Sequence, residues 1–378
     1  GWSKMQIANI DRAEIIRGSV GAQYGGAGFG GIIVLTSPTA FTEDKIYVSS
    51  DYGSDNAYAL NAGISINDDQ QAIRANICRK SNDGWREHSR YKSSNIHVKY
   101  ERFHTSKLYL SGTASLCFTD EQDPGALSFE ELITNRNMET VNVLGNPWQS
   151  SNNSKDLLAS LSGKYIYSRN YTFDFRAYMK HKNRNNIATI TAPVKEDAKA
   201  YTYGIDLSLK KKMRILRRSL SINIGTALEY GRLNSHYAEH QDLIDDLDDI
   251  SDNSSSCINV AAFSQINYGL SDIISVQGGL RYDYLNTRCK YNLYTSMNDE
   301  ADHYRQDSEI SPKLGLTIMP IKDLSVYFAA SRAFKFPTLL HLYESVPIYY
   351  VEPSVYSAYF SISNADLRPQ RGTCYETG

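Results

Sequence analysis

The sequence IDRAEIIRG at residues 10–18, followed by YGGAGFGGIIVLT at residues 24–36, decides the fold of this chain. Two short runs rich in β-branched residues flank a glycine-dense turn. Gly26, Gly28 and Gly31 match the dinucleotide fingerprint G-x-G-x-x-G, but that chemistry needs a strand before the glycines and a helix starting on them. Here the glycines lead into a strand-like run that stops at a Ser-Pro pair. The stretch therefore indicates a loop in which glycine permits positive φ and close backbone approach.

The same stretch carries a resemblance to a known family. It is similar to the end of the plug domain of TonB-dependent outer-membrane receptors, where the pattern reads roughly I-E-R-I-E-V-L-R-G, then A-L-Y-G, then G-G-V-I-N-I. The sequence departs from that pattern at Asp11 and at Ala13. The order and spacing of several unlike residue types agree, and the positions that carry the match are Glu14, Arg17, Gly18, Tyr24, Gly25, Gly30 and Gly31.

Length and composition leave both soluble and membrane classes open. A chain of 378 residues has room for two domains or for one large β structure. The net charge of −2 gives no general electrostatic reason to expect a nucleic-acid partner. No run approaches the eighteen or so apolar residues of a membrane helix, and the mean hydropathy is −0.44. That test is blind to membrane barrels, whose strands alternate lipid-facing and lumen-facing residues.

The content of tyrosine and cysteine is also informative. Tyrosine, with 28 residues against 12 phenylalanines, suits strands and the boundary between membrane and water. The cysteines are scattered, odd in number and without a C-x-x-C pair, so they indicate neither a zinc site nor a disulfide framework. We interpret them as small side chains on strands or in loops; they are Cys78, Cys117, Cys257, Cys289 and Cys374.

After Pro38 the sequence alternates between apolar and polar residues with a period of two. In residues 273–285, for example, Ile274 and Val276 share one face while Gln277 and other polar residues share the opposite face. A period of two indicates strands with one apolar and one polar face. About fourteen such strands are predicted after residue 45, and the clearest others are residues 108–118, 171–180, 220–230 and 324–330.

The predicted connections alternate between short and long. Tight turns on one edge and long loops on the other are typical of an outer-membrane barrel, with periplasmic turns and extracellular loops. The basic cluster at residues 210–218 falls on the edge of the short turns. Short connections are predicted at residues 67–70, 104–106, 168–170, 269–271 and 320–322, and long ones at residues 80–93, 119–155, 181–198, 233–256, 286–309 and 334–370.

The apolar faces of these strands carry no Lys, Arg, Asp or Glu, while the opposite faces carry several. A charged side chain that faces lipid costs about 2–4 kcal/mol for Arg or Lys at mid-membrane. A soluble β protein would tolerate stray charges on such a face. The sequence therefore predicts an all-β fold, a transmembrane antiparallel β-barrel.

The resemblance extends over the predicted barrel. DGWREHS at residues 83–89 is similar to the family's D-G-W-R-D-N-S, and SPKLGL at residues 311–316 to its S-P-K-L-G-L. SRAFKFPT at residues 331–338 resembles S-R-G-F-R-A-P-T, and NADLRPQ at residues 364–370 resembles N-P-D-L-K-P-E with a following Y-E-x-G. The positions carried over are Gly84, Arg86, Arg332, Phe334, Pro337, Thr338, Asp366, Leu367, Pro369 and Glu376.

No residue pattern assembles a catalytic or metal centre. HYAEH at residues 236–240 spells H-x-x-E-H. Zinc ligation would need a helix that places both histidines on one face, whereas this stretch is predicted to lie in a long acidic loop. The aspartates that follow lack the glycine and the final glutamate of an EF-hand. No spaced nucleophile, base and orienting group stands out, so we expect no enzyme, no metal site and no cofactor.

The resemblance implies a domain organisation. Residues 1–40 would be the C-terminal part of a plug domain, and residues 41–378 the N-terminal portion of a barrel. The chain would supply about 14 of the 22 strands expected of such a receptor. It would lack the TonB box, most of the plug and roughly the last eight strands. Because only a closed barrel satisfies its backbone groups in lipid, we expect the chain to be a fragment of a longer product.

The resemblance also implies a role. The chain would serve TonB-dependent active uptake across the bacterial outer membrane, with TonB and its inner-membrane energising complex, outer-membrane lipid and a small-molecule metal chelate as partners. DPGALSFEE at residues 123–131 resembles the P-G-A-L-T-x-x-Q/E loop of many ferric-chelate receptors and favours a ferric siderophore or related iron complex. Cobalamin or another bulky nutrient is an alternative. A passive porin or surface β-barrel protein is an alternative of another class, against which the plug-like segment argues. No motif assigns the ligand-binding residues.

Overall fold

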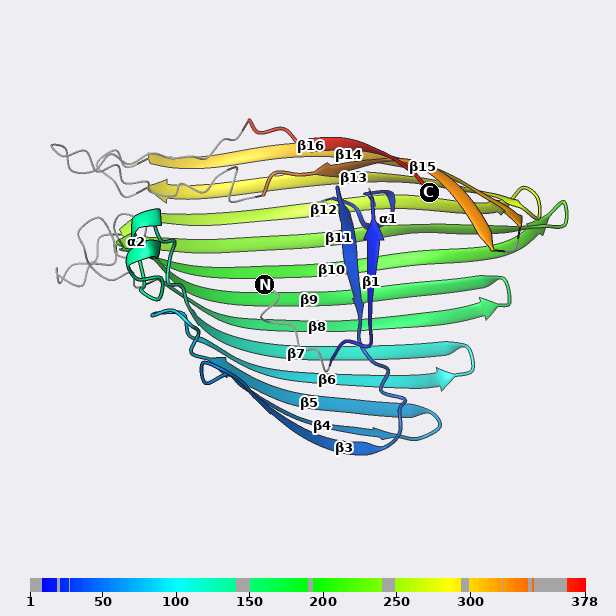
Figure 1. Ribbon diagram of the computed structural model, residues 1–378. Helices are drawn as coiled ribbons and strands as arrows, with labels where there is room; N and C mark the ends of the chain where they lie inside the picture. The colour runs from blue at the N-terminus through cyan, green and yellow to red at the C-terminus, as the bar shows by residue number, and fades with distance from the viewer. Residues whose placement is uncertain are drawn as a thin grey trace.

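The computed structural model describes residues 9–18, 21–26, 28–140, 150–189, 193–239, 249–293, 299–321, 323–338, 342 and 366–378. Fourteen strands, β3 to β16, form one antiparallel sheet in chain order, each paired with the next (Figure 1). This meander confirms the predicted all-β fold and strand number. The strands are β3 (Lys45–Tyr52), β4 (Tyr58–Asn67), β5 (Gln71–Asn82), β6 (Tyr91–Thr105), β7 (Leu108–Gln122), β8 (Ser151–Ser168), β9 (Tyr171–Thr189), β10 (Pro193–Ile215), β11 (Arg218–Glu239), β12 (Asp249–Gly269), β13 (Ile274–Leu293), β14 (Asp299–Ile321), β15 (Leu324–Lys335) and β16 (Gln370–Thr377).

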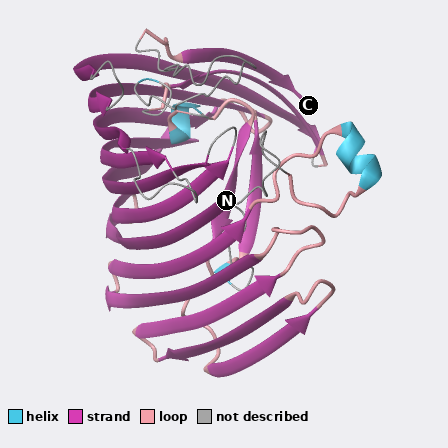
Figure 2. Cartoon of the chain, turned by 90° about the vertical axis from the view of Figure 1, so that its left-hand side faces the viewer, coloured by secondary structure: helices cyan, strands magenta, loops and turns pink. Residues whose placement is uncertain are grey.

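The sheet curves like an open trough, and the N-terminal segment lies on its concave side (Figure 2). In that segment β1 (Arg12–Arg17) pairs antiparallel with β2 (Gly31–Thr36). A one-turn helix, α1 (Gly21–Tyr24), connects them, which the sequence did not predict. Gly31 has φ +127°, and a Cβ there would overlap the carbonyl oxygen of Ile16. The glycine-dense stretch thus permits a close chain approach, as its composition predicted.

The two faces of the sheet differ as the alternation predicted. On the convex face Phe173, Leu209 and Ile224 lie in one row across β9, β10 and β11, and all three side chains are exposed. One residue further along β9, Asp174 lies on the concave face opposite Ser208. The exposed apolar face is the one that lipid would cover, whereas the polar face lines the trough.

The connections fall on two different edges. Tight turns join the strands at residues 67–70 and 168–170, on the right of Figure 1, and β15 begins three residues after β14 ends. Leu216 and Arg217 form the turn between β10 and β11 with φ of +50° and +65°. Two successive left-handed residues make a type I′ turn, which fits the twist of a hairpin. The basic cluster at residues 210–218 lies on this edge, as predicted.

Three of the predicted long loops are wrong for much of their length. Residues 181–189 and 193–198 belong to β9 and β10, and the described parts of 233–256 and 286–309 extend β11 to β14. Both faces are polar here, so the alternation disappears from the sequence although the backbone ladder continues. The same correction places His236 and Glu239 of the H-x-x-E-H pattern on β11 rather than in a loop; His240 lies outside the described residues.

Helical structure is confined to two short pieces of the described chain. Besides α1, the connection between β7 and β8 holds α2 (Phe129–Thr134), whose N-terminus is capped by Ser128 and Glu131 in a capping box. No helix among the described residues is long and apolar enough to cross a membrane.

Candidate functional site

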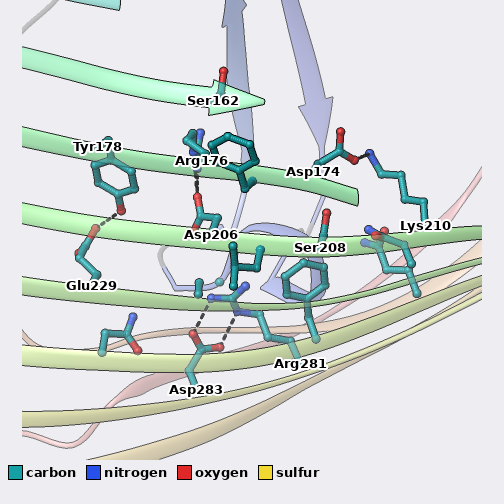
Figure 3. A pocket seen from close by; sticks show the side chains of 18 of the residues that line it. Ser162, Asp174, Arg176, Tyr178, Asp206, Ser208, Lys210, Glu229, Arg281 and Asp283 are labelled. Atoms are coloured by element: carbon teal, nitrogen blue, oxygen red, sulfur yellow. Dashed lines mark hydrogen bonds and ion pairs between the residues drawn. The ribbon is translucent and has the colours of Figure 1, made fainter. Parts of the chain in front are cut away.

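A cavity of about 850 Å³ opens between the concave face of β8–β13 and the N-terminal segment (Figure 3). Strand alternation points every second side chain of each strand into it. The charged groups that line it number four cations and four anions, so the wall is polar but close to neutral. They are Lys164, Arg176, Lys210 and Arg281, with Asp174, Asp206, Glu229 and Asp283.

Four of these eight charges are paired between the neighbouring strands β9 and β10. Arg176 Nε donates to Asp206 Oδ2 at 2.8 Å, and Lys210 Nζ lies 2.8 Å from Asp174 Oδ2. Both pairs are visible in Figure 3 on adjacent strands. Because these pairs face a wet cavity, each contributes little to stability. These ion pairs expose both positive and negative groups to any solute that moves along the wall.

One ion pair at the cavity floor is buried. Arg281 donates to both carboxylate oxygens of Asp283, at 2.8 and 2.9 Å, and both side chains are less than a tenth exposed. The guanidinium also lies over the ring of Phe263. Gly25 of the N-terminal segment has φ +79°, and a Cβ there would lie 3.0 Å from the Arg281 guanidinium. Glycine at this position therefore lets the segment backbone approach the wall.

Motifs from the two ends of the chain meet where the N-terminal segment contacts the concave face of the sheet. A Cβ on Gly26 would touch the ring of Phe334 at 3.2 Å, and Phe334 is buried and packs edge-on against Phe336. Gly18 lies so close to the Glu376 carboxylate that a Cβ would overlap it. The plug-like and barrel-like motifs predicted from the sequence therefore form one interface between the N-terminal segment and the sheet.

Beside this interface, Glu309 binds two arginines of the wall. Its carboxylate, which is almost fully buried, accepts from Arg332 Nη2 at 3.2 Å and from Arg371 Nε at 2.7 Å. The three residues come from β14, β15 and β16, so the pairing joins three neighbouring strands. Arg332 carries the barrel resemblance, whereas the sequence did not single out Glu309 or Arg371.

The end of the N-terminal segment, residues 37–44, is bound to the wall as a strap. Lys99 on β6 donates to Ser37 Oγ at 3.2 Å and to the Pro38 carbonyl at 2.8 Å. Its neighbour Glu101 accepts from Thr39 Oγ1 at 2.7 Å and from the backbone N–H of Ala40. The sequence missed this anchor, and its only signal was two opposite charges on the polar face of a strand.

The strap has further polar contacts with the wall. Lys99 and Glu101 also pair with each other at 3.1 Å, and Tyr109 donates to Glu101. Further on, Asn67 binds the Thr42 carbonyl and Asp44. Earlier in the segment, Gly18, Gly25 and Gly26 lie against the sheet through close packing.

Two of the barrel-motif residues, Gly84 and Arg86, lie at the loop edge of the sheet. Gly84 has φ +76° in the loop between β5 and β6. Next to it Arg86 donates to the carbonyls of Pro124, Gly125 and Met138 at 2.7–3.1 Å, and so ties that loop to the connection that carries α2. These two motif residues shape the loop edge and do not line the cavity.

The remaining predicted positions share no single site. Glu14 pairs with Arg12 at 3.1 Å on β1, and Arg17 ends that strand. Tyr24 lies in α1, with its side chain outside the described residues. No atom lies within 4 Å of a Cβ built on Gly30. The others flank strands: Pro337 and Thr338 follow β15, and Asp366, Leu367 and Pro369 precede β16.

No metal-binding group is assembled in the part of the chain that the structure describes. His, Cys, Asp and Glu side chains there do not gather in groups of three or more that could hold an ion. Helical placement of the H-x-x-E-H histidines, which zinc would need, does not occur because His236 is in a strand.

Solved structures share this architecture. Ferric citrate transporter FecA in the unliganded form matches with a TM-score of 0.78 at 14% identity, covering 88% of this chain and 50% of that chain. The siderophore receptor PiuA from Acinetobacter baumannii gives 0.79 at 13% identity, covering 98% and 59%. Copper transporter OprC gives 0.75 at 14% identity, covering 98% and 56%. The chain thus spans between half and three fifths of these structures, and identities this low establish the fold alone.

A family model assigns the chain at the level of sequence. No curated protein sequence matches it. The model described as "TonB dependent receptor-like, beta-barrel" matches residues 19–378, which is nearly the whole chain. The family and the structures above are receptors and transporters, not enzymes. The chain belongs to the TonB-dependent receptors of the bacterial outer membrane.

Proposed function

We propose that this chain is part of a receptor that takes up a ferric siderophore or a related iron complex, energised by TonB. The supporting observation is the N-terminal segment in the trough, held at its end by the strap and packed through glycines against Phe334 and Glu376. A segment of this kind obstructs the lumen of a barrel. Iron complexes are favoured by the resemblance of residues 123–131 to ferric-chelate receptors and by the names of FecA and PiuA.

In this proposal residues 1–40 are the C-terminal part of a plug, and residues 41–378 are barrel wall. A ligand bound at the loop edge would lie above the plug. TonB would pull on the plug from the periplasm, and the segment would move relative to the wall. The near-neutral polar surface with Arg176, Asp206 and Arg281 would then line the path that opens.

Two other cargo classes remain as outcomes of the test. Cobalamin or another bulky nutrient would use the same energised mechanism, and a similar structure is named a copper transporter. A passive porin is disfavoured because the packed N-terminal segment would block diffusion.

The test is uptake by cells that carry the full-length receptor as their sole receptor of this type. We expect ⁵⁹Fe to accumulate from one or more chelates on a panel of purified siderophores, and accumulation to stop when tonB is deleted. Uptake of cobalamin or copper instead, with no iron chelate transported, would contradict the cargo assignment. Uptake that persists without TonB would contradict energised transport itself.

A further inference from the structure

A histidine at the loop edge joins two parts of the connection between β7 and β8. His88 Nε2 lies 2.7 Å from the carbonyl oxygen of Ser150, and the other ring nitrogen, Nδ1, lies 3.8 Å from Glu139 Oε2. Glu139 and Ser150 flank residues 140–149 in the sequence. The ring of His88 therefore lies at the base of that stretch, with one nitrogen toward each end of it.

The backbone of the loop places the ring in this position. His88 has a left-handed φ of +53°, which asparagine, aspartate and histidine adopt more readily than other non-glycine residues. The neighbouring Glu87 N–H donates to the Asn137 carbonyl at 2.8 Å, and the Asp123 N–H donates to the Ser150 carbonyl at 2.9 Å. The ring thus meets a carbonyl and a carboxylate whose positions the backbone has already set.

The neutral form of the ring cannot satisfy both neighbours. A carbonyl oxygen only accepts, so Nε2 must carry a proton in order to bond Ser150. A neutral imidazole has a single N–H, which leaves Nδ1 as an acceptor that faces the Glu139 carboxylate. The protonated ring has an N–H on both nitrogens and a positive charge. Protonation therefore turns a contact between two acceptors into an ion pair.

The surroundings of Glu139 favour the protonated ring. Glu139 Oε2 is buried and has no hydrogen-bond donor among the described residues, and a buried oxygen without a donor costs free energy. Both side chains are about a fifth exposed, so salt screens their attraction less than that of a surface pair. Arg86 already donates to three carbonyls of the connection. A proton on His88 Nδ1 supplies the positive charge that faces this oxygen.

The other charged groups around the ring are of types that keep their charge near neutral pH. Arg90 pairs with Asp120 at 3.6 Å, and Glu121 accepts from Asn152. Residues 141–149 contain no titratable side chain. Of all these residue types only histidine ordinarily changes its charge between pH 5 and 8. The further charged residues nearby on the loop and the connection are Asp83, Arg86, Glu87 and Asp123.

We propose that His88 is a proton-operated latch on the connection at residues 123–150. At low pH the imidazolium binds the Glu139 carboxylate and the Ser150 carbonyl together and closes the base of residues 140–149. As the pH rises, His88 loses one proton, keeps its bond to Ser150 and releases Glu139. The latch stabilises the closed connection in acid and not in alkali, because the closed form binds one proton more. It acts at the loop edge whatever cargo the receptor carries.

Hydrogen–deuterium exchange of the full-length receptor in lipid nanodiscs tests the latch. It is measured at about pH 5.5 and about pH 8, on either side of the histidine range. Each rate is divided by the rate of an unstructured peptide at the same pH, which gives a protection factor. Protection at residues 137–140 should fall about five-fold between the lower and the higher pH, the effect of one partly exposed ion pair. Protection in β10 and β11 should stay constant.

Two variants remove the latch, and one is a matched control. His88→Asn tolerates the left-handed φ but carries no titratable group, and Glu139→Gln removes the opposite charge; both should abolish the pH dependence at residues 137–140. His104→Asn changes an exposed histidine at the other end of β6 and should keep it. If His88→Asn lacks the heat-modifiable mobility of a folded barrel on a gel, Glu139→Gln alone decides. Constant protection in the unaltered receptor, a pH dependence that survives in either folded latch variant, or its loss in His104→Asn would each overturn the proposal.

Discussion

At the residue scale, two neighbouring side chains on β6 fix the end of the N-terminal segment. Lys99 and Glu101 are a tenth exposed or less and satisfy each other, Pro38, Thr39 and Ala40. A buried pair of this kind is costly to break, because the remaining charge is left without a partner. The strap is therefore firmly attached to the wall at Lys99 and Glu101.

Substitution of Glu101 tests this anchor. Glu101→Ala should cost about 3 kcal/mol locally, so amide exchange at residues 37–41 should rise roughly a hundred-fold while exchange in β10 and β11 stays unchanged. Hydrogen–deuterium exchange of the full-length receptor gives both values. Glu43→Gln, on an exposed strap residue without a bond to the sheet, is the matched control. Unchanged exchange at Ala40 in Glu101→Ala would show that the strap is held otherwise.

Arg86 is the corresponding anchor at the loop edge. Its planar guanidinium binds three carbonyls at once, which a lysine cannot reproduce. Arg86→Lys should therefore make the connection at residues 123–140 several-fold more sensitive to limited proteolysis on intact cells. Arg136→Lys, an exposed position in the same connection, should leave the cleavage rate unchanged. Equal rates for the two variants would contradict the assigned role.

At the element scale, the hairpin of β10 and β11 carries avoidable strain. Leu216 and Arg217 both adopt left-handed φ, which costs ordinary residues about 1 kcal/mol or more each. Asn-Gly is the pair that a type I′ turn favours. L216N/R217G should raise the midpoint of denaturant-induced unfolding of the receptor, by about 1 kcal/mol in free energy. L216A/R217A keeps the left-handed strain and should give no such gain; a gain of the same size would exclude the turn as its source.

At the scale of the whole molecule, the sheet has two edges. Within the described residues β3 pairs only with β4, and β16 only with β15. Unpaired backbone N–H and C=O groups cost several kcal/mol each in hydrocarbon. In the membrane both edges must therefore find partner strands.

Amide exchange measures whether the edge strands β3 and β16 have partner strands in the membrane. In the full-length receptor in lipid nanodiscs, we expect the amides of β3 and β16 to exchange as slowly as those of the central strands β10 and β11. The tight turn at residues 67–70 is an internal reference for fast exchange. Fast exchange along β3 or β16 would mean that the edge stays open and that the barrel does not close there.

The sequence by itself determined the strands, their number, the apolar face and the family. All follow from local signals: period-two alternation between Phe173 and Lys180, turn residues, and motifs such as those at Gly18 and Glu376. It failed where both faces are polar, because the extended ends of β9–β14 then look like loops.

Only the tertiary structure decided which residues meet. Gly18 and Glu376 lie more than 350 residues apart in the sequence and pack together, and Glu101 binds a strap about 60 residues away. Alternation fixes the face on which a side chain lies but not the neighbour it meets, since the neighbour depends on how far each strand is shifted against the next.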